Sequence, residues 1–167
     1  DAALADLGGH WQAPLALPLG ARLGALPSAG VEAEARLPAE PTLAIAVVGA
    51  HLSGMPLHGQ LTERRCRLLR KARTAARYRL YALPGTVPPK PGLARTQEGG
   101  AIELEVYEMP ISEVGSFLAL IPSPLGLGTV ELEDGSTVKG FICEPWALQG
   151  AKDITAFGGW RAYVASL

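Results

Sequence analysis

Thr42-Leu-Ala-Ile-Ala-Val-Val-Gly-Ala-His-Leu-Ser-Gly-Met-Pro-Leu-His-Gly-Gln60 is the stretch around which the rest of the sequence is organised. Leu43 to Val48 is an apolar run of strand length, and the glycines and proline that follow it are typical of a buried strand that leads into a loop. Small residues from Gly49 to Gly54 would let a ligand approach the backbone, so that several N–H groups could bind an anion. His51 lies in this loop and titrates near neutral pH.

The composition predicts one folded, turn-rich domain with a tail. The chain has 167 residues, of which 48% are hydrophobic and 19% charged, with 20 Gly and 14 Pro. A net charge of −1 gives no general attraction to nucleic acid or anionic membrane. No apolar run is long enough to span a bilayer and no export signal is evident. Cys66 and Cys143 are too few for a disulfide framework, so we expect a reducing, cytoplasmic setting.

Two regions differ in composition. Residues 1–40 are rich in Ala, Leu, Pro and Gly, with one short helix predicted near Ala2 to Trp11. This region is typical of a linker or of the end of a preceding domain. Residues 41–167 are predicted to form the folded domain, with the segment from 153 to 163 packing back on its body.

Alternating and β-branched stretches in residues 41–167 predict strands. Asp134-Gly135 is the clearest hairpin signal in the sequence. A short helix is predicted over Glu113 to Ile121, with Ser112 as its N-cap. About five or six strands with two or three short helices indicate an α+β domain with a mixed, barrel-like sheet. The predicted strands are 43–48, 78–83, 93–96 paired with 102–109 as a hairpin, and 129–133 paired with 136–144.

Polar side chains share one face of the stretch from Ile102 to Met109. Apolar residues alternate there with Glu103, Glu105 and Tyr107, which places these three on the same side of a strand. On an edge strand this face would point to solvent. In a closed sheet it could line a cavity instead, where burial would raise a carboxyl pKa into the acid–base range.

Positive charge gathers in one segment. Thr62 to Arg79 contains eight of the fifteen Lys and Arg residues. Few aromatic residues lie nearby, so a solvated face or an attractant for a small anionic substrate is favoured over a nucleic-acid surface. The histidines have no metal-ligand spacing, so we expect no metal site.

Five blocks of the sequence carry a resemblance to a known family. They are Val47-Val-Gly-Ala-His-Leu-Ser-Gly-Met-Pro-Leu57, Tyr78-Arg-Leu-Tyr-Ala-Leu83, Pro124-Leu-Gly-Leu-Gly-Thr-Val130, Val138-Lys-Gly-Phe141 and Asp153-Ile-Thr-Ala-Phe-Gly-Gly-Trp-Arg161. In this order they are similar to the C-terminal domain of allophanate hydrolase. The segment from Leu15 to Gly20 resembles the end of an amidase domain running into that C-terminal domain. The resemblance implies a fold similar to that of γ-glutamyl cyclotransferases.

The resemblance also implies a function in urea degradation. In this family the amidase half hydrolyses allophanate to N-carboxycarbamate and ammonia, and the C-terminal half is reported to promote decarboxylation of N-carboxycarbamate. The implied partners are therefore a small dicarboxylate substrate and the amidase domain of the same chain. The Tyr-Gly-Ser-Leu loop of cyclotransferases is replaced here by Gly49-Ala50-His51-Leu52. Glu105 stands where the cyclotransferase acid–base Glu would be, but Leu104 replaces the usual Gly, so cyclotransferase activity is not favoured.

Our hypothesis from the sequence is a decarboxylase-type domain of a hydrolase. His51 would donate a proton to nitrogen, and Glu105 would orient it or share the proton. No organic cofactor is needed, and the basic segment would attract the doubly negative substrate. The residues expected to bind the carboxylates are Leu52, Ser53, Gly54 and Met55 through their N–H groups, and Arg79, Lys139 and Tyr81 through their side chains.

Two alternatives remain open from the sequence. The domain could be a non-catalytic module for assembly or stability of the parent enzyme, because N-carboxycarbamate decomposes unaided. It could also be a cyclotransferase-like enzyme acting on a γ-glutamyl amine. The sequence does not settle the oligomeric state, and both a monomer and a homo-oligomer are compatible with it.

Overall fold

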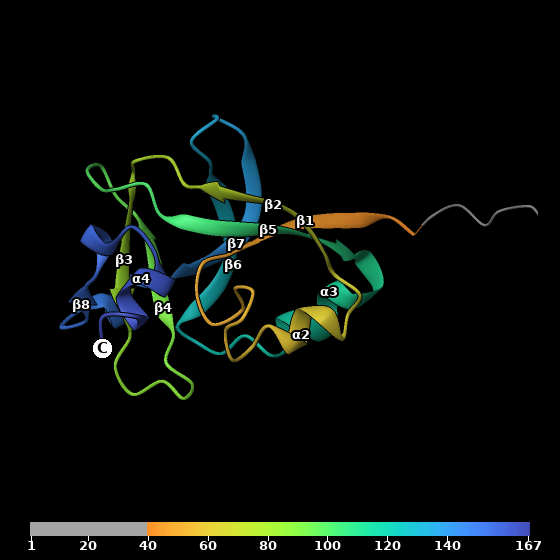
Figure 1. Ribbon diagram of the computed structural model, residues 1–167, viewed down its shortest axis with the longest axis horizontal. Coiled ribbons are helices and arrows are strands. Elements are labelled where there is room, and N and C mark those ends of the chain that lie inside the picture. Colours follow the sequence, from red (N-terminus) through yellow and green to blue (C-terminus); the bar gives the residue numbers. More distant parts are fainter. Residues whose placement is uncertain (1–39) are drawn as a thin grey trace, which may run out of the picture. The chain divides into compact units, whose positions relative to one another are not determined.

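The computed structural model describes residues 40–167, with a five-stranded sheet at its centre (Figure 1). The predicted linker and the helix near residues 2–11 lie outside the described residues. Strand β1 (Thr42–Val47) is the central strand in the order β2-β5-β1-β7-β6. It pairs antiparallel with β5 and parallel with β7, so the sheet is mixed. The other strands are β2 (Arg67–Arg73), β5 (Glu103–Pro110), β6 (Leu125–Glu131) and β7 (Thr137–Cys143).

The two edge strands of this sheet meet just beyond their ends. An antiparallel bridge joins Thr74, after β2, to Leu132, after β6. On either side of it, the N–H of Ala75 donates to the Glu131 carbonyl at 2.9 Å and the N–H of Glu133 donates to the Arg73 carbonyl at 3.0 Å. Closing the edges pairs backbone groups that would otherwise be exposed. The prediction of an α+β domain with a mixed, barrel-like sheet is confirmed.

A second sheet has three strands in the order β4-β3-β8. They are β3 (Tyr78–Ala82), β4 (Pro91–Arg95) and β8 (Lys152–Asp153). The predicted hairpin between 93–96 and 102–109 is therefore wrong, because β4 pairs with β3 and β5 pairs with β1 and β2. The connection between them packs on β3, where a Cβ on Gly99 would lie 2.4 Å from the Tyr78 carbonyl oxygen. Local alternation identifies a strand but not its partner.

The helices are short and lie at the two ends of the main sheet (Figure 1). Helix α3 begins directly after β5, two residues earlier than predicted. Ser112 is therefore not its N-cap: Pro110 holds that position, and the N–H of Ser112 donates to the Glu40 carboxylate at 2.9 Å. The helices are α2 (Gly59–Thr62), α3 (Ile111–Leu118) and α4 (Trp160–Val164), with 3-10 turns at η2 (Pro145–Leu148) and η3 (Thr155–Phe157).

The predicted hairpin at Asp134-Gly135 is confirmed by the pairing of β6 with β7. Gly135 has a φ of 81°, which favours glycine, and Asp134 accepts a 2.9 Å bond from the N–H of Ser136. The bonds from Ser136, together with Arg70, lower the pKa of Asp134 to about 2.

Strand β5 is buried on both faces, although its sequence alternates. Leu104 and Val106 pack into the main core, while Glu105 and Tyr107 lie under the loop that follows β1 and are 0% and 2% exposed. The barrel and this loop therefore enclose the polar face of β5. Within residues 40–167, no helix has the length and apolarity required to span a membrane.

Candidate active site

The loop after β1 forms one wall of a small pocket, whose cavity volume is about 40 Å³. The residues from Val47 to His51 line one side, and the lining also includes Pro91, the first residue of β4, and Lys90 directly before it. An apolar wall is supplied by the connection from α3 to β6, by the start of β6 and by β7. Its residues are Leu120, Ile121, Pro122, Leu125 and Phe141.

Three consecutive backbone N–H groups of this loop have no acceptor among residues 40–167. They belong to Gly49, Ala50 and His51, all of which are buried and line the pocket. Buried backbone donors are nearly always bonded, so a set of three without acceptors indicates a place for an anion.

The N–H groups expected to bind substrate lie slightly later in the loop. Three of those four already have acceptors: Leu52 donates to the Gly49 carbonyl at 3.0 Å, Met55 to the Leu52 carbonyl at 2.9 Å, and Ser53 to Glu105 at 2.7 Å. These bonds shape the loop. The fourth, the N–H of Gly54, has no acceptor among residues 40–167 but belongs to an exposed residue, so the buried free donors are those at the beginning of the loop.

Gly49 is required where the loop meets the second sheet. A Cβ at this position would lie 2.3 Å from Cδ of Pro91. The proline ring therefore sits directly on the loop backbone and fixes the start of β4 against it. Lys90, the preceding residue, is in this way held at the edge of the pocket.

His51 is 9% exposed and is oriented through one ring nitrogen. Its Nε2–H donates to Oε1 of Gln60 at 2.8 Å, and the ring packs edge-on against Phe117 with 5.1 Å between centroids. This tautomer leaves Nδ1 as the nitrogen that can accept and release a proton. Burial lowers the pKa of His51, the Gln60 bond raises it, and the charges of Lys90 and His58 lower it further, with a net lowering.

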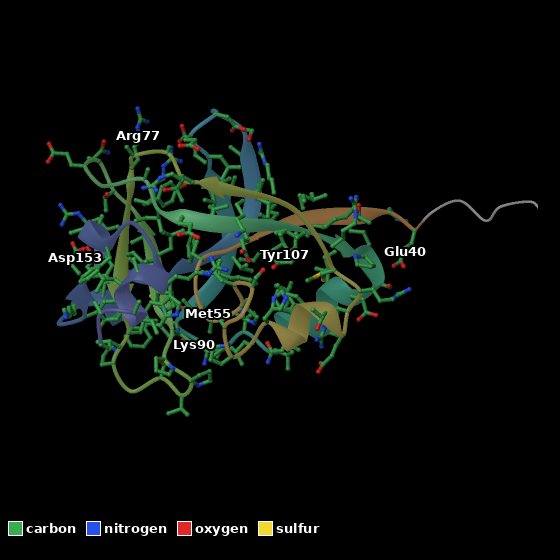
Figure 2. All side chains as sticks on the ribbon, in the orientation of Figure 1. Glu40, Met55, Arg77, Lys90, Tyr107 and Asp153 are labelled. Carbon is green, nitrogen blue, oxygen red and sulfur yellow. The ribbon has the colours of Figure 1, made fainter. Side chains whose placement is uncertain are left out.

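Lys90, labelled in Figure 2, is the cation that lines the same pocket as His51. It is half-buried, and no carboxylate among residues 40–167 forms an ion pair with its ammonium group. Its backbone is fixed by Thr86, whose hydroxyl oxygen accepts the Lys90 N–H at 2.9 Å. The sequence analysis missed Lys90 because a proline-rich segment is typical of an exposed loop. The sequence feature that could have identified Lys90 is its position directly before strand β4.

Glu105 is completely buried and bonded on both carboxylate oxygens. Oε2 accepts bonds from the Ser53 N–H at 2.7 Å, the Ser53 hydroxyl at 3.0 Å and the Tyr107 hydroxyl at 3.0 Å. Oε1 accepts a 2.8 Å bond from Arg161. Arg161 also donates to Glu103 at 2.8 Å and to the Ser53 carbonyl at 2.9 Å. The shared face predicted for Glu103, Glu105 and Tyr107 is confirmed by these contacts.

The predicted direction of the Glu105 pKa shift is wrong. Burial raises the pKa, but the bonds from Ser53, Arg161 and Tyr107 together outweigh it, and the net effect lowers the pKa of Glu105. The carboxylate is ionised at neutral pH and has no bond to His51. Glu105 therefore anchors the loop at Ser53, while His51 is oriented by Gln60. Arg161 was visible in the sequence only within a matched block, because its partners are distant in the chain.

The other predicted binding side chains lie outside this pocket. Arg79 lies 3.5 Å from Asp153, which is at the left edge of the view in Figure 2, away from Lys90 at the lower centre. Lys139 is exposed on β7 and donates to the Thr129 hydroxyl at 3.2 Å. Tyr81 is half-buried in β3, paired with β4 and β8.

Much of the basic segment is neutralised by partners on neighbouring elements. Arg67 pairs with Glu108 at 2.6 Å and Arg70 with Asp134 at 2.8 Å. Arg64 lies over the ring of Phe117 and donates to Ser116. Within residues 40–167, no cluster of His, Cys, Asp and Glu could hold a metal ion.

This fold is shared with γ-glutamyl cyclotransferases. A solved structure of one superimposes with a TM-score of 0.50 at 12% identity, over 68% of this chain and 70% of that chain. The likeness at this identity concerns the fold alone, and it confirms the fold class predicted from the sequence.

The family is defined by closer relatives. A model of the allophanate hydrolase C-terminal domain matches residues 43–165, and the chain therefore belongs to this family. Urea amidolyase of Saccharomyces cerevisiae is 47% identical over 131 residues, which is 75% of this chain and 7% of that protein. The structure of Kluyveromyces lactis allophanate hydrolase gives a TM-score of 0.73 at 47% identity, over 75% of this chain and 21% of that one. The chain thus spans a small part of these relatives.

A further solved structure is of nearly the same extent as this domain. A uropathogenic E. coli-specific protein is 30% identical, with a TM-score of 0.70, and the match covers 76% of this chain and 98% of that one. The same fold therefore also occurs in a chain of little more than one such domain.

Proposed function

We propose that this domain promotes loss of CO2 from N-carboxycarbamate, the product formed by the amidase part of the same enzyme during urea degradation. The observation that carries this proposal is the combination, in one pocket, of an imidazole with one free nitrogen and three buried backbone N–H groups without acceptors. The first can deliver a proton and the second can hold a carboxylate.

The reaction breaks the bond between nitrogen and one carboxylate carbon. The electron pair of that bond remains on nitrogen, CO2 leaves, and a proton from Nδ1 of His51 is delivered to the same nitrogen, which yields carbamate. The imidazole regains its proton from solvent. Proton delivery matters because an amine is a far better leaving group than an amide anion, and a group that titrates near the working pH is suited to the task.

We assign Glu105 a positioning role. It holds Ser53 through both its N–H and its hydroxyl, and Ser53 lies two residues after His51. Since all the bonds to Glu105 stabilise its ionised form, it is poorly suited to donate a proton. The same bonds argue against cyclotransferase chemistry, which would require this carboxyl group as an acid or base.

The test is a stopped-flow measurement of CO2 release from allophanate by a separately produced amidase part, with and without this chain. We expect the chain to remove a lag between ammonia and CO2 release, and His51→Gln to leave the lag in place. Urea unfolding of both proteins will show that the variant is folded. If the lag is equal with the chain, with the variant and without either, the domain is an assembly or stability module.

A further inference from the structure

We infer that Lys90 makes this pocket selective for a dianion: it binds the carboxylate that stays on nitrogen, while the departing carboxylate lies against the apolar wall. The assignment of the retained and departing carboxylates rests on the proposed function, whereas the selectivity for a dianion does not. The inference extends that function by assigning a different end of the pocket to each carboxylate.

The first argument is charge. Lys90 is half-buried, and no carboxylate of residues 40–167 pairs with it. The other candidate cations are engaged elsewhere, Arg79 with Asp153 and Lys139 with Thr129. Partial burial of a cation without a counterion is unfavourable, so an anion that enters the pocket gains from pairing with it.

The second argument is rigidity. The Lys90 N–H donates to the Thr86 hydroxyl at 2.9 Å, and its carbonyl accepts the Leu83 N–H at 3.1 Å. Pro91 is seated on the backbone of Gly49. The backbone of Lys90 is therefore fixed relative to the loop that carries the free N–H groups, and both line the same pocket.

The third argument is the polarity of the pocket. Its polar groups, Lys90, His51 and the loop N–H groups, come from different elements than its apolar residues Leu120 to Leu125 and Phe141. Negative charge leaves the departing carboxylate as neutral CO2 forms, so a cation there would stabilise the substrate more than the transition state. An apolar wall instead disfavours the charged carboxylate of the substrate more than the transition state, in which that charge is being lost. A cation on the retained carboxylate lies next to the nitrogen, where charge develops.

The binding test compares malonate with malonamate by calorimetry on the full chain, at a pH where every carboxyl group is ionised. In malonate a CH2 replaces the NH of the substrate, and malonamate carries one carboxylate fewer. We expect malonate to bind about tenfold more tightly, and Lys90→Met to abolish this preference. Lys90→Arg should retain most of it. Lys152→Met is the control, because Lys152 is exposed on β8 and lies over Tyr163. Equal preference in wild type and Lys90→Met would overturn the inference.

The orientation is tested with Leu125→Lys, which places a cation on the apolar wall. We expect this variant to bind malonate more tightly and to release CO2 more slowly. Faster release would overturn the orientation.

Lys90→Met should raise KM in the CO2 assay with a smaller change in kcat, and Lys90→Arg should restore KM. If malonate selectivity follows Lys90 while the wild-type chain has no effect on CO2 release, the proposed function fails and the selectivity stands. If the chain accelerates CO2 release and Lys90→Met has the wild-type KM, the proposed function stands and the role assigned to Lys90 fails.

Discussion

His51 is held through Nε2, and this fixes which of its two nitrogens can exchange a proton. The bond to Gln60 Oε1 is 2.8 Å long, and the ring edge contacts Phe117. Burial lowers the pKa of His51, so that the imidazole is mainly neutral at pH 7. As a proton donor it acts in its protonated form, and the rate is therefore expected to fall as pH rises through this lowered pKa.

Gln60→Glu is expected to raise the pKa of His51. A carboxylate beside Nε2 would stabilise the imidazolium by about one to two pKa units. The falling limb of the pH–rate profile should move to higher pH by the same amount, and the titration of the His51 ring, followed by NMR, should move with it. Gln60→Ala removes the bond without adding charge and should move the ring titration to lower pH. A profile unchanged in Gln60→Glu would show that another group controls the rate.

Gly49→Ala is expected to destabilise the domain by about 1–3 kcal/mol, because the new methyl group would overlap the Pro91 ring. Gly126→Ala is the matched control, since a Cβ there meets nothing within 4 Å. Urea unfolding should separate the two variants. Similar stabilities would show that β4 shifts away from the loop at little cost.

At this scale the sequence predicted residue types better than their partners. The loop at His51 and the shared face of Glu105 and Tyr107 follow from local spacing. The pairing of Glu105 with Arg161 does not, because the two are 56 residues apart in the chain. Lys90 was missed for the same kind of reason: its position beside His51 depends on how the second sheet meets the first.

Helix α4 connects the end of the described chain to the pocket loop. Its Arg161 bonds Glu103, Glu105 and the Ser53 carbonyl, and its side chain is 26% exposed. Trp160 and Tyr163 of the same helix are buried in the core. A helix of one turn is thus held by packing and by charge together, and its loss would release the loop.

Arg161→Met is expected to cost about 3–5 kcal/mol, because it leaves Glu105 buried and without its cation. The pKa of Glu105 should rise, so the loss in stability is expected to be smaller at acidic pH. The matched variant Arg67→Met removes an exposed partner of Glu108 and should change the unfolding midpoint little. Equal effects of the two variants, measured by urea unfolding, would argue against the network.

Element boundaries show where sequence patterns suffice. The strands β1, β3 and β7 lie where the sequence predicted them, and the turn at Asp134-Gly135 identified one hairpin. The connection from β4 to β5 looked like a hairpin, since a Gly-rich turn between two strands is the local signal for one. The choice of partner was made by long-range packing, which local spacing does not encode.

For the molecule as a whole, stability should decrease with acidification, in a first step through His51 and in a second through the carboxylates with lowered pKa values, Glu105 and Asp134 among them. His51 and Glu105 both have folded-state pKa values below their ordinary values of 6.5 and 4.5. In each case the unfolded state binds protons first as pH falls, so the stabilising contribution is present above the ordinary value and is lost as pH falls through the folded value. The first step is expected to begin near pH 6.5 and the second near pH 4.5.

His51→Gln should remove the first step and leave the second. The measurement is the free energy of unfolding by urea at a series of pH values, compared with wild type. A first step that persists in the variant would have to come from another group, and it would weaken the case that His51 is neutral in the folded protein.

The bond between Arg161 and Glu105 also has a consequence for the order of synthesis. Ribosomes make chains from the N-terminus, so β1, the pocket loop and β5 emerge well before Arg161 does. Until it emerges, Glu105 has no cation to accompany its burial, and a nascent barrel must either leave the carboxylate in water or protonate it. The pocket can therefore reach its final form only after Arg161 has emerged from the ribosome.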